Sequence, residues 1–365
     1  MSTLGELIHY CKHTNPLGVF MLTGEWGAGK TYLIEKQLAE TLKDTHVIVR
    51  ISMYGMSSIE QLRAAVKEKW VYACSPILGK FVKNKENANR NSGLVNALNA
   101  ILKGINPVAA NAADVMVSLN VLDMVTVEPE IEDVHSMEKK RAVLVFDDLE
   151  RSKLDPIEAM GVINEYCENQ HINTIIVTNE AYLIHTMKDD LMLYHMLKGK
   201  TVSRTVFYVP DFDSILSSII EARPWSSEKY KTYLKEKKGG ILELFSSGSI
   251  EPEKSFKASV KSHNLFVLTG ALEDFYRVYY HLKEAGIENP DPWLYSFLAY
   301  ALSRKGGVFK NGRLNFDTPD NEIAELYPMF SQEYLPRSIR EWIAYGIWDE
   351  DRFYQELAAE TKKPA

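Results

Sequence analysis

The sequence predicts an α/β protein with a parallel sheet, followed by an all-helical C-terminal region. Apolar runs of strand length alternate with helical patterns over the first half of the chain, which is typical of a parallel sheet. The first apolar run leads into a glycine-rich turn and then into a helical pattern. After about Asp211, every periodic segment has the spacing of a helix.

The first predicted strand, residues 17–23, is a continuous apolar run, as expected of a strand buried on both faces. A short helix is predicted before it at residues 4–11, and a longer one after it at residues 30–42. Residues 46–52 follow as a second strand and residues 59–72 as a second helix.

Residues 75–140 interrupt this alternation and are predicted to be a largely helical insertion, with helical patterns at residues 94–102 and 108–125. The second pattern is apolar but contains Asp114 and Asp123. Each aspartate would cost about 2.5–3.5 kcal/mol at the centre of a bilayer, so we expect an amphipathic helix and no membrane span.

The sheet resumes with predicted strands at residues 142–146 and 173–178, separated by a helix at residues 156–168. A strand-like run then ends at Pro210. We therefore expect a first domain at residues 1–210 and a helical second domain at residues 211–365. The helical patterns of the second domain are at residues 212–222, 230–245, 263–283, 293–302, 339–348 and 351–361.

Aromatic side chains are frequent in these C-terminal patterns, and their spacing suits packing between helices. We assign them to the core, with a partner-binding groove as the alternative. They are Phe266, Phe275, Tyr276, Tyr279, Tyr280, Trp293, Tyr295, Phe297 and Tyr300.

The composition, 45% hydrophobic and 25% charged over 365 residues, is that of a soluble globular protein. A net charge of −7 argues against attraction of the whole surface to nucleic acid, but leaves a local basic groove open. The cysteines (Cys11, Cys74 and Cys167) are far apart, which favours a reducing cytoplasm and neither disulfides nor a zinc site. Residues 1–12 lack the pattern of a signal peptide. We expect a cytoplasmic protein.

The glycine-rich turn, GEWGAGKT, fits G-x-x-x-x-G-K-[ST] at every fixed position. Glycine lets the backbone turn its N–H groups toward a phosphate, and the following helix adds the positive end of its dipole. Lys30 would contact the β- and γ-phosphates, and the Thr31 hydroxyl would bind Mg²⁺. The predicted nucleotide-binding residues are Gly24, Glu25, Trp26, Gly27, Ala28, Gly29, Lys30 and Thr31.

Acidic residues follow the apolar strand at 142–146, where parallel sheets bind ligands. Asp147 is predicted to hold Mg²⁺ through its water shell, and Asp148 to orient or deprotonate the attacking water. Asn179 follows the next strand. It is predicted either to sense the γ-phosphate or to cap a helix beginning near Glu180, and one residue can do both.

Four basic residues are weaker candidates. Arg151 could pair with Glu150, which is the preferred reading, or bind phosphate, or reach a neighbouring subunit. Lys198, Lys200 and Arg204 are expected either at a solvated helix end or in contact with phosphate.

The loop with its tryptophan, together with FDDLER at residues 146–151, resembles the two motifs of the KAP family of P-loop NTPases, which is similar to the STAND class of AAA-related signalling ATPases. Weaker likeness extends to residues 50–55 and 198–201 and to the helical half. Two features depart from the family: the insertion carries no membrane span, and Asn264-Leu265-Phe266 stands where relatives have Asn-[Ile/Leu]-Arg.

These residues predict a Mg²⁺-dependent ATPase that acts as a molecular switch, with the helical half responding to the γ-phosphate. The resemblance implies a prokaryotic or phage-associated sensor or regulator in antiviral defence, with an unidentified protein effector; AAA-like relatives often form homo-oligomers. An adaptor with a structural, scarcely hydrolysed nucleotide is the alternative, which the missing arginine favours and the intact Asp147 and Asp148 oppose. A nucleic-acid motor is the least favoured reading.

Overall fold

The computed structural model describes residues 2–74, 125–132, 139–187, 190–246, 261–310 and 313–360. The chain divides into two compact units. The first comprises Met1–Gly24 and Lys30–Tyr208, and the second comprises Glu25–Gly29 and Val209–Ala365. In the described residues, no helix combines the length and the apolarity needed to cross a bilayer.

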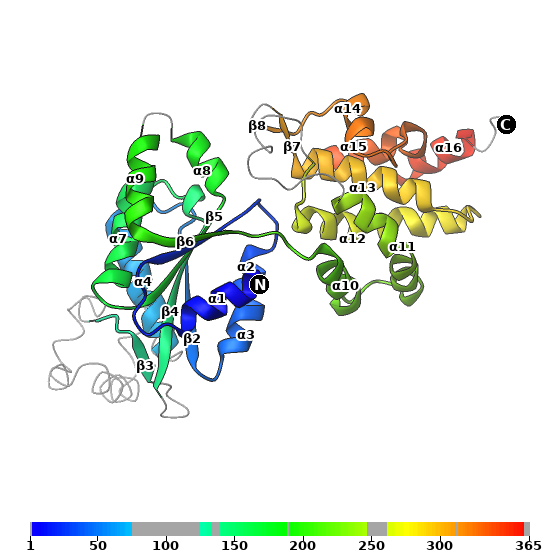
Figure 1. Ribbon diagram of the computed structural model, residues 1–365. Helices are drawn as coiled ribbons and strands as arrows, with labels where there is room; N and C mark the ends of the chain where they lie inside the picture. Colours follow the sequence, from blue (N-terminus) through cyan, green and yellow to red (C-terminus); the bar gives the residue numbers. More distant parts are fainter. Residues whose placement is uncertain are drawn as a thin grey trace, which may run out of the picture. The chain divides into compact units, whose positions relative to one another are not determined.

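The first unit is built on a parallel sheet with the strand order β2-β4-β5-β1-β6 (Figure 1). Its parallel strands are β1 (Val19–Thr23), β2 (His46–Ser52), β4 (Lys139–Asp147), β5 (Asn173–Thr178) and β6 (Val202–Phe207). This confirms the predicted α/β class. The carboxyl ends of β1, β4 and β5 are neighbours, so the segments that follow these strands meet at one edge of the sheet.

Helices cover both faces of this sheet, which explains why all five residues of β1 are buried. Figure 1 shows one group of helices on each face. The group on one face is α4 (Ile59–Cys74), α7 (Pro156–Glu168), α8 (Glu180–Thr186) and α9 (Leu191–Thr201). The group on the other is α1 (Thr3–Lys12), α2 (Lys30–Tyr32), the π-helical segment η1 (Leu33–Leu38) and α3 (Ala39–Leu42). The single helix predicted at residues 30–42 is thus three helical segments.

Most of the predicted insertion at residues 75–140 lies outside the described residues. The helical pattern at residues 94–102 lies outside them entirely, and the pattern at residues 108–125 does so apart from Val125. The described part differs from the prediction. Glu130–Glu132 forms a strand, β3, that pairs antiparallel with the start of β4, which itself begins at Lys139. Three residues are too few for an alternating pattern to be recognised, so this strand could not be predicted.

The second unit is predominantly helical, as predicted. Its helices are α10 (Phe212–Ala222), α11 (Glu228–Ser246), α12 (Leu265–Glu284), α13 (Asp291–Gly306), α14 (Asp320–Leu326), α15 (Arg337–Tyr345) and α16 (Glu350–Glu360), with a 3₁₀ turn, η6 (Gln332–Tyr334). A short antiparallel hairpin of β7 (Val308–Lys310) and β8 (Arg313–Asn315) was not predicted.

Aromatic side chains form much of the core of the second unit. Phe275 and Phe297 are almost completely buried, and their ring centroids lie 5.5 Å apart. The core assignment is wrong for Phe266, which is 85% exposed in the first turn of α12, and for Tyr280, which is 49% exposed.

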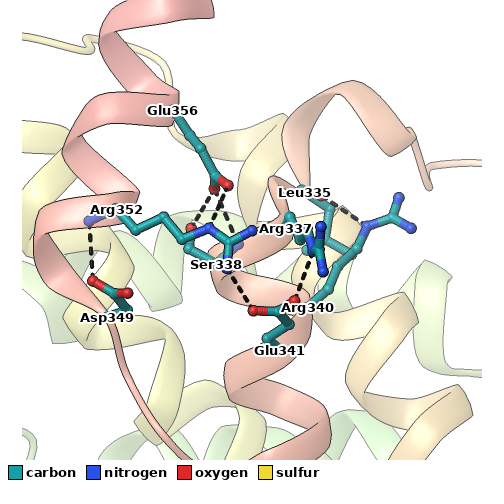
Figure 2. A network of polar contacts seen from close by, with 8 residues as sticks. All are labelled: Leu335, Arg337, Ser338, Arg340, Glu341, Asp349, Arg352 and Glu356. Carbon is teal, nitrogen blue, oxygen red and sulfur yellow. Dashed lines mark hydrogen bonds and ion pairs between the residues drawn. The ribbon is translucent and has the colours of Figure 1, made fainter.

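A network of charged side chains joins α15 to α16 (Figure 2). The Arg352 guanidinium donates to Glu341 of α15 over 2.7 Å and to Glu356 of its own helix over 3.1 Å. Glu356 also accepts hydrogen bonds from the backbone N–H and the hydroxyl of Ser338, which is almost completely buried. The C-cap of α15, Gly346, takes the left-handed conformation, so the helix ends there and the chain turns toward α16, which the network links to α15.

Candidate functional site

The phosphate loop joins β1 to α2, as predicted from its glycines. Gly27 and Gly29 have φ values of 72° and 93°, in the left-handed region that favours glycine. Lys30 begins α2 and is buried, and its Nζ donates a 2.8 Å hydrogen bond to the carbonyl oxygen of Gly24. The lysine side chain therefore folds back along its own loop. A lysine at the start of this helix has to take that direction to reach a phosphate held by the loop.

The tip of the loop, Glu25–Gly29, belongs to the second unit. There the Leu265 N–H donates to the Gly27 carbonyl over 3.0 Å, and His263 Nδ1 lies 3.2 Å from Glu25 Oε2. A Cβ on Gly27 would stand 2.3 Å from the side-chain oxygen of Asn264, so this position requires glycine for packing as well as for its backbone.

Asn264 itself caps α12 by accepting from the N–H groups of Phe266 and Val267. The tripeptide that stands in place of Asn-[Ile/Leu]-Arg is thus the start of α12.

Asp147 is the last residue of β4 and is 3% exposed, and both of its carboxylate oxygens accept hydrogen bonds. Oδ2 accepts from the Thr31 hydroxyl over 2.9 Å and from Arg50 Nε over 2.7 Å, and Oδ1 accepts from the Asp148 N–H over 2.9 Å. The two residues predicted to hold magnesium, 116 positions apart in the sequence, are in direct contact.

Arg50, on β2, is the first residue of the weak family likeness at residues 50–55, but no role in the site was predicted for it. Its Nη1 donates to Glu35 on η1 over 3.0 Å, so the guanidinium bridges two carboxylates. Burial acts to lower the pKa of Arg50, but the charge and the hydrogen bond of Asp147 outweigh it and the pKa is raised.

Asp148 takes the left-handed backbone conformation, with φ 61° and ψ 38°, directly after the strand. Its side chain is 25% exposed, and Oδ1 lies 3.7 Å from Arg151 Nη1. Burial, and then the negative charges of Asp147 and Glu150, raise the pKa of Asp148. Arg151, expected beside Glu150, forms this ion pair instead, and its guanidinium lies 4.6 Å from the centre of the Tyr54 ring.

Glu150 was considered only as a partner of Arg151, but it is buried and accepts a 2.9 Å hydrogen bond from the Thr178 hydroxyl. The 3₁₀ turn η5 (Leu149–Arg151) directs this carboxylate back toward the end of β5. No sequence signal separates Glu150 from its acidic neighbours, because its direction depends on the left-handed residue before the turn.

Asn179 follows β5 and caps α8, since its side-chain oxygen accepts from the Tyr182 N–H over 3.2 Å. Next to it, Glu180 donates its N–H to the Thr23 hydroxyl at the end of β1 over 3.0 Å. The end of β5 is thereby attached to the strand that leads into the phosphate loop. The role of Asn179 as a γ-phosphate sensor stays a prediction.

The other basic residues have separate partners. Lys198 forms a largely buried ion pair with Glu180, which also accepts a hydrogen bond from Tyr194. Arg204 pairs with Glu6 of α1, and Lys200 is exposed at the end of α9. Lys198 and Lys200 both lie in the last turn of α9, where Lys200 is exposed and Lys198 is largely buried, whereas Arg204 lies on β6.

The residues at this edge fit a magnesium nucleotide. Hydroxyl and carboxylate oxygens are the ligands that Mg²⁺ prefers. The Thr31 hydroxyl donates its proton to Asp147, which leaves its oxygen lone pairs for a cation.

Comparison with the curated proteins gave no match. Among solved structures, a chain from the structure of Drosophila ORC bound to GC-rich DNA and Cdc6 matches with a TM-score of 0.31 and 10% identity, over 98% of this chain and 47% of that one. The present chain thus spans about half the length of that chain.

A family model gives a more specific result. The model for the KAP family P-loop domain matches residues 1–265, which include the phosphate loop, the acidic motif and the whole parallel sheet. The match confirms the resemblance carried by GEWGAGKT and FDDLER. This chain belongs to the KAP family of P-loop NTPases.

Proposed function

We propose that this protein is an ATP-binding, Mg²⁺-dependent molecular switch that hydrolyses ATP slowly. The observation that carries the proposal is the direct hydrogen bond between Thr31 and Asp147. It joins the phosphate-loop helix to the acidic strand end, which is the arrangement that a P-loop NTPase needs around its metal.

Each residue has a distinct role in this proposal. The loop N–H groups and Lys30 bind the phosphates, while Thr31 and Asp147 hold the metal and its water shell. Asp148, with a pKa raised above that of an ordinary aspartate, orients the attacking water and accepts its proton. When bound, magnesium neutralises charge on the phosphoryl oxygens. Asn179 lies one residue beyond β5, where it could exchange its capping bond for one to the γ-phosphate.

The alternative is an adaptor whose nucleotide is structural. One observation favours it: the polar groups at the end of β5 already have partners, since Thr178 is bonded to Glu150 and Asn179 to the backbone of α8. An adaptor predicts tight nucleotide binding without turnover.

Phosphate release distinguishes the two. With ATP and Mg²⁺, the native protein should release phosphate, and Asp148→Asn should reduce the rate by about 100-fold or more, as removal of a general base does. ATP binding by Asp148→Asn should be unchanged, and Lys30→Ala should abolish it. Equal, background-level release by the native protein and Asp148→Asn would contradict hydrolysis and favour the adaptor.

We extend the proposal to a regulatory role in antiviral defence, with a protein effector and a homo-oligomeric form. Its support is the resemblance to STAND-class signalling ATPases. A pull-down from the host with ATP and with ADP tests it, since a switch should retain its effector in only one nucleotide state.

A further inference from the structure

We propose that Arg50 is a positioning residue for the magnesium site: it orients the Asp147 carboxylate toward Thr31 and balances its charge before a magnesium nucleotide binds. The inference rests on the proposed function, because it concerns the same site.

The first argument is the burial of Asp147. A carboxylate that is 3% exposed is costly unless it is paired with a cation and hydrogen-bonded. Arg50 supplies both, through an ion pair of 2.7 Å to Oδ2. A charge-assisted bond of this length is among the stronger contacts that a side chain can make.

The second argument is the direction of the bonds. Oδ2 accepts from Thr31 and from Arg50, while Oδ1 is occupied by the Asp148 N–H. Rotation of the carboxylate would break all three hydrogen bonds. Arg50 therefore keeps Oδ2 facing the Thr31 hydroxyl, and with it the orientation in which the hydroxyl oxygen can accept a metal.

The third argument is the shape of the guanidinium. Nε contacts Asp147 at the end of β4, and Nη1 contacts Glu35 on η1, in the helical run that starts at the phosphate loop. A planar fork can hold two carboxylates at fixed angles, whereas a lysine ammonium is a single point charge on a flexible chain. Arg50 thus connects three elements at the level of the metal site.

These arguments predict an effect on magnesium and not on phosphate. The two hydrogen bonds of Arg50 described above go to carboxylates, so its loss should alter the metal site without altering the phosphate loop. Loss of a residue that orients a metal ligand weakens metal binding by about 10–100-fold.

The test is a Mg²⁺ titration of the binding of ATP carrying a fluorescent N-methylanthraniloyl group, with the whole chain. Arg50→Gln should raise the Mg²⁺ concentration at half-maximal binding by about 10-fold or more. Arg50→Lys should raise it by a smaller factor. Glu35→Gln is the matched control, which keeps the bond to Asp147 and should leave the midpoint within about two-fold of native. In EDTA, all variants should bind the nucleotide as the native protein does.

Two results would overturn the inference: an unchanged Mg²⁺ midpoint in Arg50→Gln, or an equal loss of binding in EDTA, which would make Arg50 a phosphate ligand. If Arg50→Gln does not fold, as a thermal melt would show, Arg50→Lys decides, and a native midpoint in that variant contradicts the inference. Failure of the native protein to bind the nucleotide at any Mg²⁺ concentration would instead contradict the proposed function.

Discussion

Two neighbouring parts of one sheet edge differ in how completely their acidic groups are paired. The Asp147 side chain is 4% exposed and is held by Thr31, Arg50 and the Asp148 N–H. The Asp148 side chain is 25% exposed and lies 3.7 Å from Arg151, with a raised pKa. On the proposed function, this difference suits the two aspartates to different tasks: Asp147 is held by several bonds that would position the metal, and Asp148 has a less constrained side chain that would act on water.

The strongest test of this contrast is Asp147→Asn. Loss of the carboxylate charge removes an acceptor for metal-bound water and leaves Arg50 facing a neutral amide, so Mg²⁺-dependent ATP binding should weaken by about 100-fold. Isothermal titration calorimetry measures the affinity. The matched control is Asp148→Asn, which should change the affinity by about two-fold at most. Equal losses in the two variants would show that the two aspartates do not differ as proposed.

The next largest effect is expected on stability, from the hydrogen bond that Thr178 donates to Glu150, two residues after Asp148. Glu150→Ala would leave a buried hydroxyl without this acceptor, so unfolding should become easier by about 1.5–3 kcal/mol. Urea denaturation measures this change. In a double-mutant cycle with Thr178→Val, the two losses should not add, because both variants lack the same bond. Thr178→Ser keeps the hydroxyl and serves as the control, and additive losses would contradict the coupling.

Asn179→Ala separates the capping role from the sensing role. Loss of the cap on α8 should cost about 1 kcal/mol of stability. Asp155→Ala, which removes the cap of α7, is the matched control for stability alone. If Asn179 only caps, the two variants should release phosphate at similar rates. A rate at least 10-fold lower in Asn179→Ala alone would support the γ-phosphate sensor.

The smallest effect is expected from Arg151→Ala. Its side chain is 48% exposed, and exposed ion pairs contribute about 0–1 kcal/mol. The melting temperature should therefore shift much less than in Arg50→Gln. A loss of stability equal to that of Arg50→Gln would remove the distinction between the two sides of the site.

The parts of the site that could be predicted are those with a local signal. The phosphate loop has fixed spacing within eight residues, and Asp147 follows an apolar strand. Arg50 could not be predicted, because it lies 97 positions from Asp147 and the contact depends on the register in which β2 pairs with β4. Phe266 was assigned to the core from its spacing, but in the first turn of α12 it lies on the exposed side.

The same distinction holds for the fold. The alternation of apolar runs and helical patterns predicted β1, β2, β4 and β5, since these strands contain continuous apolar runs. For β6 (Val202–Phe207), which is exposed or half-buried, only a strand-like run at residues 206–209 was recognised. The strands β3, β7 and β8 have three residues each, and the pattern of alternation is too short to be seen. The helix predicted at residues 30–42 is interrupted by a π-helical segment, for which the residue pattern gives no sign.

The left-handed backbone at Asp148 has a consequence for how this protein can evolve. Glycine, asparagine and aspartate enter that conformation readily, whereas β-branched residues are strongly disfavoured there. A lineage that abandoned hydrolysis would therefore be expected to carry asparagine or glycine at position 148 and rarely valine or isoleucine. Asparagine and glycine fit the same backbone without a carboxylate, so the conformation alone does not require aspartate at this position. Retention of aspartate at this position would then be a mark of selection for activity.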